Sequence, residues 1–138
     1  MTYEQCRTSI KDLLAALVTS GDLQRVYVDV PETLQDVPCA VLMGSEGRMG
    51  WAFGGVVAPD EEHTETIRLY VRDKLGADAM AAVRALRVTV LTALRAKGGL
   101  DGHGEIAGVT WTAPGSATVA ARDYASMELA VTFVVKAP

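Results

Sequence analysis

The stretch TIRLYVR (residues 66–72) decides the fold, because it alternates apolar and polar side chains with a period of two. Such alternation is typical of a β-strand with one buried face. The apolar face carries Ile67, Leu69 and Val71, and the other face carries Arg68, Tyr70 and Arg72. A strand of this kind needs a second layer of structure to cover its apolar face.

Two segments with helical periodicity can supply that layer. The first begins near Thr2, which has capping-box spacing to Gln5, and ends at Gly21. The second begins at Asp78 and ends at Gly98. In both, apolar residues recur at steps of three and four, so each helix has one stripe to bury.

Further alternation predicts strands near residues 26–30 and 39–43, and near 107–113 and 127–135. Short turns between strands favour antiparallel pairing. The sequence therefore predicts one α+β domain over residues 1–138. We expect an antiparallel, mainly four- to five-stranded sheet with two helices packed on one face, in the order α-β-β-β-α-β-β. The opposite face is expected to carry Tyr27, Leu42, Arg68, Tyr70, Arg72, Thr110, Thr112, Glu128 and Thr132.

A glycine-rich stretch from Gly44 to Pro59 separates the second and third predicted strands. We expect a long loop at 44–59, because glycines disfavour regular structure. Aromatic residues and arginine anchor many interfaces, and Trp51 and Phe53 could equally fold back onto their own domain. The side chains of interest in the loop are Arg48, Met49, Trp51 and Phe53.

Trp111 and Phe133 are in phase with neighbouring valines, so we expect both in the core.

The composition narrows the function. A formal net charge of −4 disfavours duplex DNA or an anionic membrane as the main binding partner. The two cysteines, Cys6 and Cys39, are too few for a disulfide framework and are expected as buried thiols. No stretch approaches transmembrane length without a charge, so we expect a soluble protein with no membrane partner.

The histidines and serines of the sequence do not occur in the patterns of known catalytic or metal sites. His63 and His103 are expected in exposed loops, without the spacing of a metal site. Ser45 and Ser116 each follow a glycine but lie outside the Gly-x-Ser-x-Gly motif of hydrolases. The glycine-rich stretch lacks the Gly-Lys-Ser/Thr ending of a phosphate-binding loop. We therefore expect no catalytic, metal or cofactor site and no enzymatic activity.

The acidic run Asp60, Glu61 and Glu62 is interpreted first as a solvated edge, because consecutive residues of an extended chain point to alternate sides. In a ring-shaped assembly the same three carboxylates could line a pore and keep DNA from adhering.

Nearly the whole chain resembles the tail terminator (tail completion) proteins of long-tailed, lambda-like bacteriophages. The segments that carry the resemblance are LQDVPCAVL (34–42), TIRLYVR (66–72), VLTAL (90–94) and the ending 125–135. It implies a homo-hexameric ring that caps the tail tube, ends its polymerisation and offers a surface for head–tail joining. The implied partners are other copies of the chain, the tail tube protein and the head–tail connector protein, with DNA as a passing polymer. The implied location is the virion tail, assembled in the host cytoplasm.

On this basis the open sheet face and the long loop are expected to contact neighbouring subunits and the tube. We expect Arg68, Tyr70 and Arg72 to meet carboxylates of the adjacent subunit, with Asp29 and Glu128 as candidates. The loop contacts would come from Arg48, Met49, Trp51 and Phe53. The alternatives are another head–tail completion or minor tail protein, and a small cellular α+β domain that binds a ligand.

Overall fold

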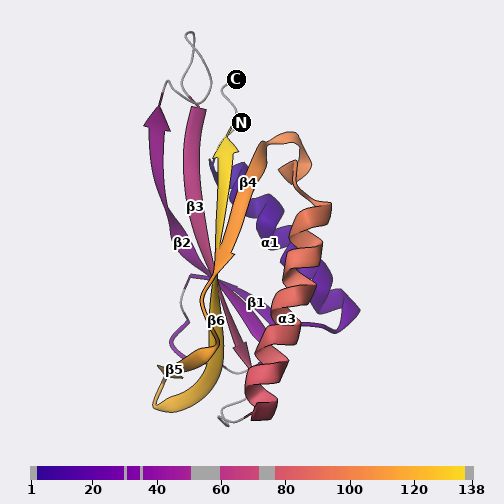
Figure 1. The fold of residues 1–138 in the computed structure, drawn as a ribbon, viewed down its shortest axis with the longest axis vertical. Coiled ribbons are helices and arrows are strands. Elements are labelled where there is room, and N and C mark those ends of the chain that lie inside the picture. Colours follow the sequence, from indigo (N-terminus) through magenta and orange to yellow (C-terminus); the bar gives the residue numbers. More distant parts are fainter. Residues whose placement is uncertain (1–2, 30, 35, 51–59, 72–76, 136–138) are drawn as a thin grey trace.

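The computed structural model describes residues 3–29, 31–34, 36–50, 60–71 and 77–135. These residues form an α+β domain, as predicted (Figure 1). The elements are α1 (Tyr3–Ser20), β1 (Arg25–Val28), β2 (Cys39–Gly50), β3 (Asp60–Val71), α3 (Ala77–Ala96), the short 3₁₀ turn η1 (Leu100–Gly102), β4 (Gly104–Trp111), β5 (Gly115–Val119) and β6 (Arg122–Val135).

The strands form one six-stranded sheet in the order β1-β2-β3-β6-β4, with β5 paired to β6. β1 and β2 are parallel, whereas all the other pairs are antiparallel. The sheet is therefore mixed, and the prediction of an antiparallel sheet was wrong. The reason is that β1 and β2 enter the sheet from the same end, since Arg25 pairs with Cys39 and Val28 with Leu42.

The predicted order of elements was also incomplete, because three strands follow α3 instead of two. The extra strand is β5, a five-residue strand of sequence GSATV. It has no run of alternating large apolar residues, and such a run is the signal by which strands are recognised in sequence.

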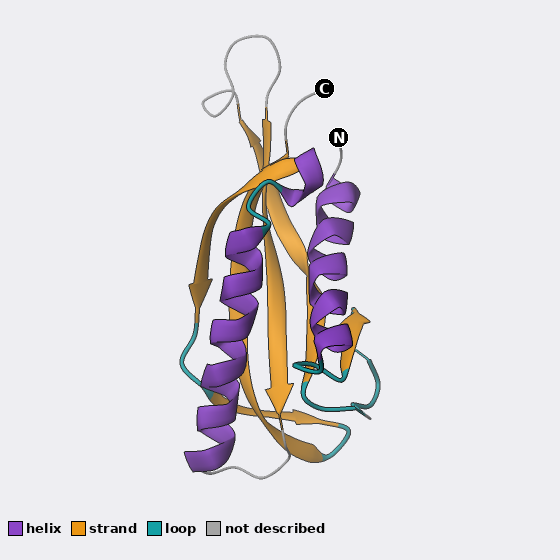
Figure 2. Ribbon diagram, turned by 90° about the vertical axis from the view of Figure 1, so that its right-hand side faces the viewer, coloured by secondary structure: helices purple, strands orange, loops and turns teal. Residues whose placement is uncertain are grey.

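Both helices lie on the same face of the sheet (Figure 2). The main core lies between them and the sheet, where the side chains of Ile10 and Leu14 from α1 and Val83 and Val90 from α3 are fully buried. Phe133 of β6 belongs to this core, as predicted. No helix among the described residues is long and apolar enough to cross a membrane.

A second, smaller apolar cluster lies on the opposite face of the sheet, at the end where β1 and β5 lie. Its buried members are Leu34, Cys39, Val41, Tyr70 and Tyr124. The predicted faces of β2 were therefore wrong. Leu42, expected on the face away from the helices, points into the main core and is fully buried, whereas Cys39 and Val41 lie on the opposite face. The residues Cys39 to Leu42 are all apolar and buried, so no alternation in the sequence marks which face is which.

The glycine-rich stretch is a strand as far as Gly50, so the predicted loop was wrong for residues 44–50. Residues 51–59 lie outside the described residues. Pairing with β3 supplies the backbone hydrogen bonds along 44–50, and the register shifts between Leu42 and Gly44. A Cβ atom at Gly47 would come within 2.6 Å of the His63 ring, so glycine at this position makes room for that ring.

A register shift between Ile106 and Gly108 changes the facing residues of β4. Beyond the shift, Val109 contacts the main core, but Trp111 is 49% exposed. The prediction that Trp111 is a core residue was therefore wrong. Trp111 is on the helix side of the sheet, as its phase predicts, but it lies on the edge strand β4, where its ring is only half covered. Instead, the guanidinium of Arg87 lies over the Trp111 ring, 5.1 Å from its centroid.

This placement predicts unequal effects of removing the two aromatic rings. Trp111→Ala should lower the free energy of unfolding by about 1 kcal/mol, because it removes a half-exposed ring and one cation–π contact. Phe133→Ala, the matched control, should lower it by about 3–5 kcal/mol, because it leaves a cavity in the core. Urea unfolding of both variants provides the comparison, and equal losses would contradict the placement of Trp111.

Candidate functional site

The sheet face opposite the helices is polar over β2, β3, β6 and β4. At its centre Arg68 of β3 stands directly opposite Glu128 of β6, and the two side chains form an ion pair. Thr64 and Thr132 also lie on this face, with their hydroxyl oxygens 3.1 Å apart. We call this surface the open face; it presents hydroxyl groups and one partly exposed ion pair.

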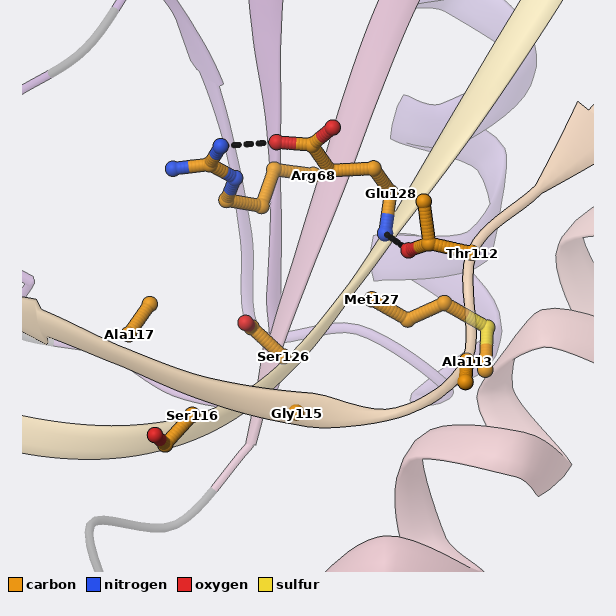
Figure 3. Close-up of a pocket in the computed structure, with 9 residues that line it drawn as sticks. All are labelled: Arg68, Thr112, Ala113, Gly115, Ser116, Ala117, Ser126, Met127 and Glu128. Atoms are coloured by element: carbon orange, nitrogen blue, oxygen red, sulfur yellow. Dashed lines mark hydrogen bonds and ion pairs between the residues drawn. The ribbon is translucent and has the colours of Figure 1, made fainter.

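Two open hollows lie on either side of the Arg68–Glu128 pair. The first, of about 260 Å³, extends from this pair to β5 and is lined by Ser116, Ala117 and Ser126 among others (Figure 3). The backbone N–H of Glu128 donates a hydrogen bond to the Thr112 hydroxyl at its rim. The second, of about 550 Å³, is lined by Met43, Gly44, Glu46, Thr64, Thr66 and Glu128.

The chemistry of the open face is that of hydrogen bonding and charge pairing. Within the described ranges, no group of three or more histidine, cysteine, aspartate or glutamate side chains could hold a metal ion. The first hollow is lined largely by small side chains, hydroxyls and the Arg68–Glu128 pair, and the second by threonines, Gly44, Met43 and the carboxylates of Glu46 and Glu128. Such a surface suits contact with another polar surface better than enclosure of a small molecule, which favours concave apolar sites.

The structure places the predicted contact residues in different environments. Arg68 and Glu128 pair with each other within one chain. Asp29 lies away from them and pairs with Arg7 of α1 at 3.2 Å. Tyr70 is 1% exposed, packed edge-on against Tyr124 in the smaller cluster, so it does not present the contact surface expected of it. The three charged residues remain candidates for a subunit contact.

The remaining predicted residues are only partly placed. Trp51, Phe53 and Arg72 lie outside the described residues. The backbones of Arg48 and Met49 belong to β2, where these residues stand opposite Glu62 and Glu61.

The acidic run that includes Asp60 is part of strand β3 and does not precede it. Glu61 approaches the ring of His63 at 3.4 Å. Alternation along β3 places Glu62 on the same side as Thr64, on the open face. A pore-lining role for the three carboxylates stays a prediction.

His63 was predicted in an exposed loop, and this was wrong. It lies in β3 with its side chain 18% exposed, and its ring stacks on that of Phe133 and contacts the ring of Tyr3 at a tilt. The centroid distances are 4.6 Å to Tyr3 and 5.7 Å to Phe133. His63 therefore packs α1 against the sheet.

A buried charge pair that the sequence did not predict joins α1 to β3. The Glu65 side chain is fully buried and accepts hydrogen bonds from the Tyr3 hydroxyl (3.0 Å), Arg7 Nε (3.1 Å) and the Gly44 backbone N–H (3.3 Å). Arg7 also donates to Asp29 and to the Leu42 carbonyl. The available signal was that Glu65 occupies the same phase of β3 as Ile67 and Leu69.

Arg7 keeps its charge on folding. Burial lowers the pKa of Arg7, but its hydrogen bonds to Glu65 and Asp29 outweigh burial and hold that pKa above its ordinary value. The carboxylate accepts three hydrogen bonds and the guanidinium donates three, which helps to offset the cost of burying a charge pair. The pair therefore fixes the start of α1 to β3 and to the end of β1.

We predict that Arg7→Met is strongly destabilising. It leaves the Glu65 carboxylate buried without its cation, which should cost about 3–5 kcal/mol in the free energy of unfolding. Lys11→Met, on the same helix at an exposed position, is the matched control and should change it little. Chemical denaturation of both variants measures the difference, and a stable Arg7→Met protein would show that the pair is dispensable.

A second polar anchor joins α1 to the turn that follows α3. Asp101 accepts hydrogen bonds from the Ser9 hydroxyl and from Lys97 Nζ. These two contacts hold the pKa of Asp101 below its ordinary value. A carboxylate with a depressed pKa stabilises the fold above its unfolded pKa, and this contribution is lost as the pH falls through the folded pKa.

Asp101→Asn should therefore reduce stability at pH 7 but much less in acid. Asparagine tolerates the left-handed backbone at this position (φ 57°), so the variant tests the charge and not the conformation. The difference in free energy of unfolding from the wild type should shrink as the pH falls below about 4, the unfolded pKa of aspartate. Urea titrations between pH 7 and pH 2.5 would reveal a difference independent of pH if the carboxylate is unimportant.

Both cysteines are free and buried, as predicted. Burial raises the pKa of Cys6. Burial and, to a smaller extent, the nearby Asp36 raise the pKa of Cys39 to about 12. Because the thiolate is the reactive form, both native thiols should react slowly with oxidants.

Comparison with known proteins does not assign this chain to a family. Neither a scan against protein-family models nor a search of curated proteins found a match.

Proposed function

We propose that the protein is a structural virion component that forms a ring on the phage tail tube, ends its polymerisation and provides the surface for head–tail joining. The observation that carries this proposal is the one-sided layering of the domain (Figure 2). Helices cover one face of the sheet, whereas the other face, beyond the smaller apolar cluster at one end, is polar over four strands. A small domain with one large open sheet face is suited to contact other proteins in an assembly.

The charge pattern supports contacts between proteins. The Arg68–Glu128 pair is partly exposed, with side-chain exposures of 29% and 37%, so either member can exchange its partner for a group on a neighbouring subunit. The expected partners are further copies of the chain in a hexamer, the tail tube protein and the connector protein. The formal net charge of −4 suits a ring through which DNA passes without binding. In this proposal the protein is located in the virion tail, after assembly in the host cytoplasm, and is not an enzyme.

Another head–tail completion or minor tail protein would use the same open face. A small ligand-binding domain is a second candidate because of the hollow of about 550 Å³ beside Glu128. That function predicts a monomer or dimer with a discrete ligand, whereas the ring function predicts closed symmetry.

The solution mass of the purified protein, measured by light scattering across concentration, separates these functions. Negative-stain images of the same samples would show whether the associated species is a closed ring. Rings with a central hole would support the proposal that the protein caps the tail tube. A monomer at every concentration would contradict self-assembly of the isolated chain and favour a completion protein or the ligand-binding domain.

A further inference from the structure

One row of paired residues crosses the main sheet from edge to edge. Val28 pairs with Leu42, which pairs with Ile67, and Ile67 pairs with Leu129, which pairs with Trp111. The three inner residues are fully buried, but Val28 is 43% exposed and Trp111 is 49% exposed. Direct pairing places all five on the helix side of the sheet. Two exposed apolar side chains therefore mark the opposite ends of one row.

Both edges of the sheet offer backbone groups for pairing. β1 covers only residues Cys39 to Leu42 of the twelve-residue strand β2, so β2 forms the edge of the described sheet beyond that point. β4 forms the other edge, on the opposite side of the sheet (Figure 1). Near its start the Ile106 N–H is bonded to the Gly98 carbonyl, whereas Ala107, Gly108 and Thr110 are exposed. An open edge strand is a template for a strand of another chain.

The two edges match each other in direction. β2 is antiparallel to β3, β3 to β6, and β6 to β4, so β2 and β4 run in opposite directions. Two copies can therefore be placed with their sheets in line and their helices on the same side. In this arrangement β4 of one copy, beside β2 of the other, would continue the antiparallel pattern. It would lie where β1 ends, so its Trp111 would reach the exposed Val28.

The charges beside the two apolar residues are also complementary. The Arg87 guanidinium lies over Trp111 and forms no ion pair with the part of the chain that the structure describes. Asp29 follows Val28, and its carboxylate is 77% exposed although one oxygen contacts Arg7. Joining the edges would bring Arg87 of one copy towards Asp29 of the next, and complementary charges favour the correct partner and register.

We propose that a second copy of this chain docks at the edge of the sheet, with β4 of one copy paired to the free part of β2 of the next. Trp111 and Arg87 meet Val28 and Asp29 at this contact. The two surfaces differ, so the contact is heterologous, and repetition closes a ring when the rotation between copies permits it. The inference rests on the proposed ring function and names the surfaces that would build the ring.

Paired cysteines test this contact directly. Val28→Cys and Trp111→Cys in one chain lie at opposite edges of its sheet, so a disulfide between them forms only between copies. Oxidation with copper–phenanthroline should convert the double variant into a ladder of covalent multimers on a non-reducing gel. The buried Cys6 and Cys39 should contribute little background. Each single variant should give dimers at most.

The matched control is Trp111→Cys with Thr118→Cys, since Thr118 is an exposed residue of β5. Suppose that light scattering shows association, but that the test pair crosslinks no more than this control. That result would overturn the edge contact and leave the ring function standing. Crosslinked multimers that form open chains in images would support the contact but overturn the cap. Absence of both association and crosslinking would overturn both proposals.

A charge variant gives an independent readout. Arg87→Glu should weaken self-association on the order of tenfold or more, because it places a carboxylate opposite Asp29. Arg84→Glu, at an exposed position one turn earlier in α3, is the control and should weaken it much less. Equal effects of the two variants on the dissociation constant would overturn the role given to Arg87.

Discussion

The pairing of β3 with β6 is the interaction on which the rest of the structure depends. The two strands pair along residues 61–71 and 125–135, the longest run in the sheet together with that of β2 and β3. Their helix-side residues supply the centre of the main core, and their other face carries the Arg68–Glu128 pair. Core and open face are therefore two sides of the same ladder, and a one-residue slip in its register would exchange them.

The buried Arg7–Glu65 pair extends this ladder to the N-terminal part of the chain. Glu65 lies on β3, yet its donors come from α1 and from Gly44 of β2, the first paired residue after the register shift. Arg7 then reaches Asp29 at the end of β1. The short parallel strand β1 is thus held at its end by a charge network as well as by its pairing with β2. In the proposed ring this network would lie directly behind the contact at Val28, where a rigid edge favours binding because less conformational freedom is lost.

The proposed function and the proposed contact use different parts of the same sheet. The open face offers hydroxyls and an ion pair to partners that approach from one side. The two edges offer backbone groups, with exposed Val28 and Trp111 at their ends, to copies that approach in the plane of the sheet. Copies of a subunit with these two kinds of surface can form a closed ring, and each copy still presents its open face to the tube or connector.

Local residue pattern was enough to predict the helices, the α+β class, the central strands and the buried thiols. These follow from local periodicity, since Ile67, Leu69 and Val71 can share a face in no other regular structure than a strand. Features that depend on contacts between distant segments could not be predicted in this way. The parallel course of β1, the strand formed by the glycines at 44–50 and the face of Leu42 each depend on a neighbouring strand that local pattern does not specify. The same holds for the candidate site. Alternation placed Arg68 and Glu128 on one face, but their direct pairing and the burial of Tyr70 depend on the register between strands. The exposure of Trp111 depends on the position of β4 at the edge of the sheet.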